Sequence, residues 1–184
     1  MLHNFDKAFE LMMELEGGYT LHKNPTESTE TYSGIYRRYH DSWGGWAYID
    51  QGKNPPKQLV KSFYRTEFWD RIKGDELAGG IDTVVFDFAV NSAPSDAIKA
   101  LQEAIGFSGK DVDGIIGSGT LARHDVMVSD FHLSRCAEVI EEVSALRLTH
   151  MMKSNKKDLK AYGKGWSRRV CKVMARSLRN ISPF

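Results

Sequence analysis

The fold class of this chain depends on residues 81–90, which read Ile81-Asp82-Thr83-Val84-Val85-Phe86-Asp87-Phe88-Ala89-Val90. The β-branched residues of this run are typical of a strand. Its length and its continuation into Asn91 and Ser92 are also typical of a buried helix, and we favour the helix. Because the rest of the chain repeats its apolar residues at helical spacing, we predict an all-α protein.

The segments on both sides of this run show where the other helices are expected. Apolar residues recur at helical spacing over residues 4–15, 57–69, 96–105, 132–152 and 165–178, and a further helix is expected from about Ser118. Residues 34–39 are also predicted to begin a helix. Residues 19–33 are polar and have no apolar period, so we expect a loop or a short polar hairpin there. At 184 residues, the chain is predicted to form a single compact domain over residues 1–184.

The composition is that of a globular protein and excludes a membrane-spanning one. Hydrophobic residues make up 41% of the chain, but no apolar run approaches the ~20 residues that cross a bilayer. The N-terminus, residues 1–6, has neither the basic nor the apolar region of a signal peptide. We therefore expect that the protein is made in the cytoplasm and does not insert into a membrane. Cys136 and Cys171 both lie in helical stretches, so we expect buried thiols and no disulfide.

Positive charge is concentrated near the C-terminus, although the formal net charge of the chain is only +1. Between Lys153 and Arg179 the one acid is Asp158, and the basic residues are Lys153, Lys156, Lys157, Lys160, Lys164, Arg168, Arg169, Lys172, Arg176 and Arg179. This segment fits either a surface for an anionic polymer or a solvated helix face. No nucleic-acid-binding motif accompanies the charge, so we expect no nucleic-acid partner.

Glu16 stands at the end of the first predicted helix, directly before Gly17, Gly18 and Tyr19. Glycoside hydrolysis needs a carboxyl group that gives its proton to the leaving oxygen, and glycines let a sugar chain come close to the backbone. The residue therefore fits a general acid. An isolated glutamate at a helix end is more often just a solvated residue of the last turn, and both interpretations stand at this point.

Four motifs in order along the chain give the first interpretation more weight. They are Glu16-Gly17-Gly18-Tyr19, Thr31-Tyr32-Ser33-Gly34-Ile35, Phe86-Asp87-Phe88-Ala89-Val90-Asn91-Ser92 and Gly165-Trp166-Ser167-Arg168-Arg169-Val170. This order resembles the glycoside hydrolase family 108 lysozymes, also described as secretion-activator or N-acetylmuramidase proteins. Residues 97–102 and 112–121 resemble the peptidoglycan-binding region that accompanies that family.

The resemblance implies an all-α lysozyme-like fold, with a catalytic part at 1–93 and a helical part with a peptidoglycan-binding-like segment at 94–184. It implies peptidoglycan as partner and hydrolysis of the β-1,4 bond between N-acetylmuramic acid and N-acetylglucosamine, with Glu16 as general acid and no cofactor or metal. A monomeric endolysin or cell-wall remodelling enzyme is expected, which acts on the wall after release or export outside the Sec route.

The chain departs from the family in one loop. Family members have an Asp-Pro-Gly-Gly run just before the Thr-x-x-Gly-Ile motif, where this chain reads Thr26-Glu27-Ser28-Thr29-Glu30. The alternative is therefore a catalytically weakened peptidoglycan-binding or secretion-accessory protein. In phage-type lysozymes a carboxylate lies between residues spaced like Glu16 and Thr31, and here that position is Pro25. By this resemblance Thr31 would hold the catalytic water, and Glu27 or Glu30 would supply a second carboxylate.

Other polar and aromatic residues are candidates for sugar contacts. Asp87 and Asn91 are four residues apart and share a helix face, where they either bind sugar or form a buried network. Tyr19 and Tyr32 are candidates for stacking on sugar rings, whereas we expect Trp166 in the core. The histidines show no metal-ligand spacing, and no metal site is predicted.

Overall fold

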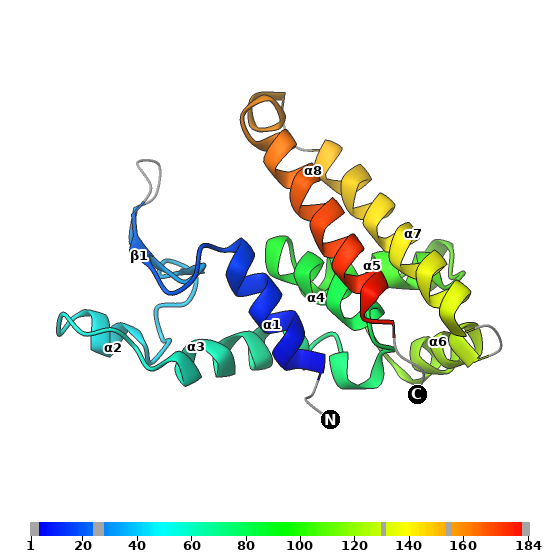
Figure 1. The fold of residues 1–184 in the computed structure, drawn as a ribbon, viewed down its shortest axis with the longest axis horizontal. Coiled ribbons are helices and arrows are strands. Elements are labelled where there is room, and N and C mark those ends of the chain that lie inside the picture. The colour runs from blue at the N-terminus through cyan, green and yellow to red at the C-terminus, as the bar shows by residue number, and fades with distance from the viewer. Residues whose placement is uncertain (1–3, 24–27, 130–131, 154–155, 182–184) are drawn as a thin grey trace.

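The computed structural model describes residues 4–23, 28–129, 132–153 and 156–181. It confirms the all-α prediction, with one small sheet after the first helix (Figure 1). The elements in chain order are α1 (Asn4–Leu15), β1 (Leu21–His22), β2 (Thr31–Tyr32), β3 (Ile35–Tyr36), α2 (Trp46–Ile49), α3 (Lys57–Tyr64), η1 (Arg65–Trp69), η2 (Gly74–Glu76), α4 (Ile81–Asn91), α5 (Pro94–Ala104), η3 (Gly109–Asp111), α6 (Ser118–Ser129), α7 (His132–Met152) and α8 (Lys156–Arg179).

Helix α4 is the centre of the molecule and settles the ambiguity of residues 81–90. Every residue from Ile81 to Ala89 is buried, because α1, α5, α7 and α8 all contact this helix. A helix that is apolar on all sides needs such complete cover. The two acids within it, Asp82 and Asp87, must therefore find partners inside the protein.

The start of α4 lies tightly against the end of α8. Gly80 has a φ of +92°, and a Cβ there would lie 2.5 Å from the backbone oxygen of Ser177. Only glycine combines this backbone conformation with so close an approach. The packing brings the C-terminal helix onto the N-terminal half of the chain.

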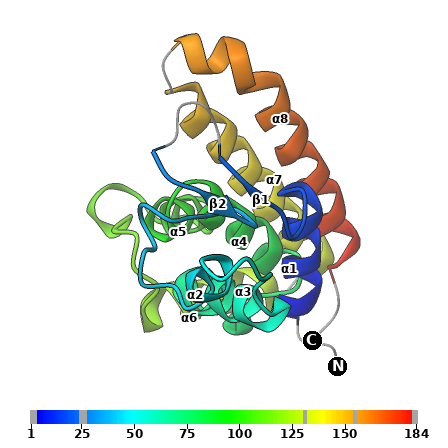
Figure 2. The ribbon, with the colours of Figure 1, turned by 90° about the vertical axis from the view of Figure 1, so that its left-hand side faces the viewer.

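The sheet lies beyond the C-terminal end of α1, at the end of the molecule away from α6 (Figures 1 and 2). Strand β2 pairs antiparallel with both β1 and β3. Ser33 and Gly34 connect β2 to β3 with φ values of +52° and +82°, as a tight two-residue hairpin requires. The prediction of a helix beginning at residues 34–39 is therefore wrong, because the chain turns back at this point and enters β3.

Helices α7 and α8 lie side by side as a long antiparallel pair (Figure 1). Helix α7 has the predicted ends, and α8 begins nine residues earlier than residue 165. Neither cysteine forms a disulfide: Cys136 is buried as expected, but Cys171 is exposed on α8, which corrects the expectation for that residue. Within the described residues, no helix has both the length and the apolar character to cross a membrane.

The segment that resembles a peptidoglycan-binding region runs from α5 through η3 into α6. Its loop is held by buried Gln102, which donates to Asp113 Oδ1 at 2.8 Å and accepts from the backbone nitrogen of Gly114 at 2.9 Å. Ile115 remains exposed beside this loop. A role of the segment in wall binding stays a prediction.

Candidate active site

Glu16 is held in place by the end of α1. Its backbone nitrogen donates to Met12 O at 2.9 Å, and the nitrogen of Gly18 donates to Met13 O at 2.9 Å. Gly17 between them has a φ of +80°, so the helix ends in the glycine-dependent cap that satisfies its last carbonyls. The side chain is 23% exposed and lines a surface cavity of about 490 Å³. The cavity lies between β3, the α3–η1 helix and the junction of α4 with α5.

Arg169 of α8 joins Glu16 to the buried carboxylate of Asp87. Its Nη1 donates to Glu16 Oε1 at 2.7 Å, and its Nη2 donates to Asp87 Oδ1 at 2.7 Å. The Nε atom lies 3.1 Å from both oxygens of Asp87. One planar guanidinium thus fixes the orientation of two carboxyl groups, as its fork of donors allows.

Asp87 is 2% exposed and is shared by two arginines. The second is Arg147 of α7, whose Nη1 donates to Asp87 Oδ2 at 2.6 Å. Burial alone raises the pKa of Asp87, but the positive charges of Arg147 and Arg169 outweigh it and hold that pKa below its ordinary value. Asp87 is therefore a carboxylate, and its fixed negative charge raises the pKa of Arg169 against the opposing effect of burial.

The hairpin turn approaches Glu16 from the other side. A Cβ on Gly34 would lie 3.3 Å from Glu16 Oε2 and 2.5 Å from the hydroxyl oxygen of Tyr64. That hydroxyl is buried and donates to Ser33 O at 2.7 Å. Burial, and then the charge of Glu16, raise the pKa of Tyr64, so the phenol keeps its proton and remains a donor. Glu16 therefore has Oε1 on Arg169 and Oε2 toward Gly34.

The aromatic and hydroxyl candidates from the sequence lie apart from this cavity wall. Thr31 is buried in β2. Tyr32, the next residue, is 2% exposed and stacks on Trp43 with 6.0 Å between ring centroids, so its faces are not open to a sugar. Tyr19 is partly exposed and has the Lys57 ammonium 4.9 Å from its ring centroid. None of the three lines the cavity that contains Glu16.

Asp87 and Asn91 share a helix face, as their spacing predicts, but their surroundings differ. Asp87 belongs to the buried network, which was the alternative to sugar binding. Asn91 is exposed at the end of α4, lines the cavity and donates back to Asp87 O at 2.9 Å. Of this pair, only Asn91 is placed to meet a ligand directly.

The structure places one of the two loop glutamates that the resemblance offers as the second carboxylate. Glu27 lies outside the described residues. Glu30 pairs with Arg37 at 3.3 Å, and Arg37 also binds Asp50 at 2.7 Å, away from the Glu16 cavity. Among the residues that the structure describes, Glu67 of η1 is the other carboxylate that lines the cavity with Glu16. Within the described residues, no cluster of three His, Cys, Asp or Glu side chains is arranged to hold a metal ion.

Four residues of the site were not predicted from the sequence: Arg169, Arg147, Tyr64 and Tyr39. Arg169 is the arginine of the Gly165–Val170 motif, so a signal existed, but the basic run around it concealed its inward position. Tyr39 is 73% exposed and lines the cavity, so it offers a ring face to a ligand. The expectation of Trp166 in the core is wrong, because its ring is half-buried and lines a second cavity.

A family model matches the part of the chain that contains Glu16. Residues 9–93 match the family model described as Glycosyl hydrolase 108. This stretch, just under half of the chain, is similar to the glycosyl hydrolase 108 family. The resemblance seen in the motifs is thereby confirmed. The matched region contains Glu16, Gly34, Tyr64, Asp87 and Asn91, while Arg147 and Arg169 come from beyond it.

A solved structure extends the similarity over the whole chain. SagA of Brucella abortus is 28% identical, with a TM-score of 0.76 over 97% of this chain and 96% of the SagA chain. The alignment therefore includes α7 and α8, the helices that carry the two arginines. No curated protein matches the chain significantly. The family match supports glycoside hydrolase activity.

Proposed function

We propose that this protein is a lysozyme that hydrolyses the β-1,4 bond between N-acetylmuramic acid and N-acetylglucosamine, with Glu16 as general acid. One observation carries the proposal. Glu16 is the carboxyl group in the cavity of the glycosyl hydrolase region that is oriented by a buried ion-pair network, through Arg169. A catalytic acid must be held at a set angle to the leaving oxygen, and this network supplies the orientation.

The two carboxyl oxygens of Glu16 have different surroundings that suit proton donation. Oε1 accepts from Arg169, whereas Oε2 lies on the Gly34 side, where the absence of a side chain leaves space. A proton on Oε2 passes to the glycosidic oxygen as the bond from that oxygen to the anomeric carbon breaks. Arg169 then stabilises the carboxylate that remains. The exposed ring of Tyr39 and the amide of Asn91 provide contacts for the sugar chain in the same cavity.

The water that adds to the anomeric carbon must be oriented and must lose a proton. We propose Thr31 for the orientation: it does not line the cavity itself, but β2 places it in the hairpin whose turn, at Gly34, approaches Glu16. Its hydroxyl is a suitable hydrogen-bond partner for a water molecule. Glu67, which lines the cavity, is our candidate for the carboxylate that accepts the proton. Glu30, paired with Arg37 away from the cavity, is the alternative.

The alternative function is a peptidoglycan-binding or secretion-accessory protein with weakened catalysis. The altered loop at residues 26–30 favours it, since the family's aspartate and glycines are absent there. The intact Glu16–Arg169–Asp87 arrangement favours the enzyme. Attachment to the wall through Lys156, Lys157 and Lys160 on the outer face of α8, and release or export outside the Sec route, stay predictions.

Digestion of purified peptidoglycan distinguishes the two functions. We expect the turbidity of a cell-wall suspension to fall, and mass spectrometry to find reducing muramic acid ends on the released muropeptides. An accessory protein would sediment with the walls and leave the turbidity unchanged. Reducing N-acetylglucosamine ends would show that the enzyme cuts the other glycosidic bond of the glycan, from N-acetylglucosamine to N-acetylmuramic acid.

A further inference from the structure

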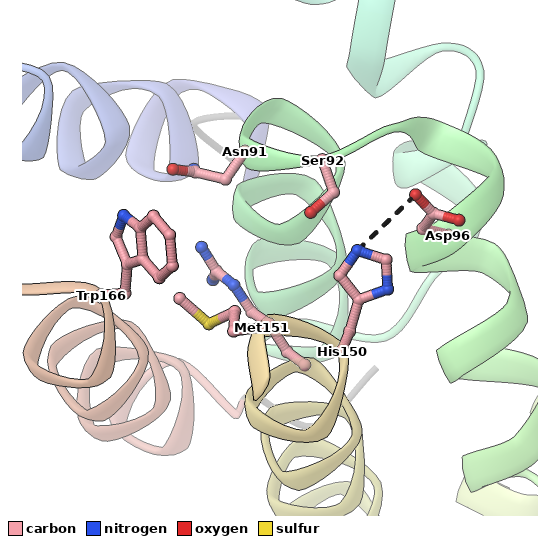
Figure 3. Close-up of a pocket in the computed structure, with 7 residues that line it drawn as sticks. Asn91, Ser92, Asp96, His150, Met151 and Trp166 are labelled. Carbon is pink, nitrogen blue, oxygen red and sulfur yellow. Dashed lines mark ion pairs between the residues drawn. The ribbon is translucent and has the colours of Figure 1, made fainter. Parts of the chain in front are cut away.

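A second cavity lies directly beside the Glu16 cavity and has no role in the chemistry described so far. Its volume is about 320 Å³. Asn91 and Ser92, at the end of α4, line both cavities, so the two are neighbours along one surface. Figure 3 shows Trp166 of α8 and Met151 of α7 on one side of this second cavity, and His150 and Asp96 on the other.

Arg147 gives this cavity an unused hydrogen-bond donor. The residue is 1% exposed and lines the cavity, and its Nη1 donates to Asp87. Its Nη2 atom is buried and has no hydrogen-bond partner among the described residues. A buried donor without an acceptor is unfavourable, and such groups in folded proteins usually have a partner. A ligand in the cavity would supply the acceptor.

The charges around the cavity indicate which kind of acceptor fits. Both arginines already have carboxylate partners: Arg147 binds Asp87, and Arg169 binds Asp87 and Glu16. Asp96 lies in the cavity wall and is paired only loosely, its Oδ2 being 4.0 Å from His150 Nε2. A ligand carboxylate would meet the like charge of Asp96, whereas an amide carbonyl accepts a hydrogen bond without adding charge.

The rest of the wall suits a small apolar group beside that carbonyl. The half-buried side chains of Trp166 and Met151 offer an aromatic face and a flexible thioether. An acetamido group or an alanyl amide combines a carbonyl oxygen with a methyl group. Peptidoglycan presents both, as the N-acetyl groups of its sugars and as the first amide of its peptide stem.

We propose that this second cavity is a substrate subsite that binds an amide group, with Arg147 Nη2 donating to its carbonyl oxygen. The proposal rests on peptidoglycan as the substrate of the Glu16 site. The subsite would hold the part of the glycan or its stem that lies next to the reacting sugars. Arg147 would then have two partners, Asp87 through Nη1 and the substrate amide through Nη2.

Binding measured by calorimetry tests the subsite without reliance on turnover. The probes are N-acetylmuramoyl-L-alanyl-D-isoglutamine, which carries both kinds of amide, and triacetylchitotriose, which carries N-acetyl groups alone. Met151→Trp fills the cavity and leaves Asp87 untouched, and Arg147→Lys removes the free donor while it keeps the charge. Met152→Trp is the matched control, because Met152 is 72% exposed and lines neither cavity.

We expect Met151→Trp and Arg147→Lys to weaken muropeptide binding by about tenfold or more, and Met152→Trp to leave it unchanged. A loss confined to the muropeptide assigns the subsite to the stem amide, and an equal loss for chitotriose assigns it to an N-acetyl group. Wild-type affinity of a folded Met151→Trp variant for both probes would overturn the proposal, as would a wild-type protein that binds neither. Specific binding without wall hydrolysis would contradict the proposed function and leave the subsite standing.

Discussion

Arg169 Nη1 donates to Oε1 of Glu16 across 2.7 Å, although 153 residues separate the two along the chain. The same guanidinium binds the buried carboxylate of Asp87. The orientation of Glu16 therefore depends on the packing of α8 against α4. An N-terminal fragment that ended with the glycosyl hydrolase region would lack this contact.

Replacement of Arg169 is expected to lower both stability and activity. Arg169→Met leaves Asp87 with only Arg147, and loss of one partner from a buried ion pair costs about 3 kcal/mol or more of unfolding free energy. Wall hydrolysis should also fall, because Glu16 loses its orienting partner. Thermal unfolding and initial rates measure the two effects.

Arg168→Met is the control, since Arg168 is exposed and its loss should change stability by less than about 0.5 kcal/mol. Equal behaviour of the two variants would contradict the network.

Substitution of Gly34 should affect activity out of proportion to stability. Gly34→Ala places a Cβ 2.5 Å from the Tyr64 hydroxyl oxygen and 3.3 Å from Glu16 Oε2, at a φ of +82°. Gly52→Ala meets similar backbone strain, at a φ of +70°, with no atom within 4 Å. Each strained backbone should cost about 1 kcal/mol. Kinetics on soluble glycan fragments should show a large loss for Gly34→Ala and near wild-type rates for Gly52→Ala, and similar rates for both would refute the close approach to Glu16.

Asp82 is expected to make the protein more stable at mildly acidic pH. Burial raises its pKa to about 6, against hydrogen bonds from Gly80 and Thr83 that lower it. The folded state therefore binds this proton more tightly than the unfolded state, whose ordinary value is 3.8. The stability contributed by the protonated group is complete below about pH 4 and is lost as the pH rises through 6, on the order of 3 kcal/mol. Asp82→Asn should remove this part of the pH profile in denaturant titrations at pH 4 to 7. An unchanged slope in that variant would assign the pH dependence to other groups.

Kinetics of two variants can tell whether Thr31 or the loop carboxylate Glu30 acts on the attacking water. If Thr31 orients the water, Thr31→Ala should lower kcat more than it raises KM, because the hydroxyl does not hold the sugar. Glu30→Gln should have little effect, since Glu30 pairs with Arg37 away from the cavity. Kinetics of both variants on a soluble oligosaccharide decide the matter. A fully active Thr31→Ala beside an inactive Glu30→Gln would transfer the role to the carboxylate.

The fold was largely predictable because most helices carry their own periodic pattern. Helix α7 has an amphipathic repeat that gave both of its ends, and residues 81–90 were assigned by length despite their β-branched content. The hairpin at Ser33 and Gly34 was missed, because the positive φ of a serine is imposed by the strands and by Tyr64. The Ser-Gly dipeptide is nevertheless typical of a turn, so the local sequence did carry part of the signal.

The site was predictable only where a motif marked it. Glu16 and Asn91 were identified and line the cavity, whereas Asp87 turned out to be the buried anchor of an ion-pair network. Arg169 was counted with the basic run near the C-terminus, since a list of charges does not tell which one turns inward. Its partners lie on α1 and α4, and only the packed structure brings them together.

The most direct test of the account is muropeptide release by Glu16→Gln, compared with wild type and with Glu14→Gln, a change at an exposed residue of the same helix. The glutamine still offers Arg169 a carbonyl oxygen but has no proton to give. We predict that wild type and Glu14→Gln release fragments with reducing muramic acid ends, and that Glu16→Gln, folded and still bound to walls, releases them about 10²–10⁴-fold more slowly. Near-normal release by a folded Glu16→Gln protein would contradict the assignment of Glu16 as the acid.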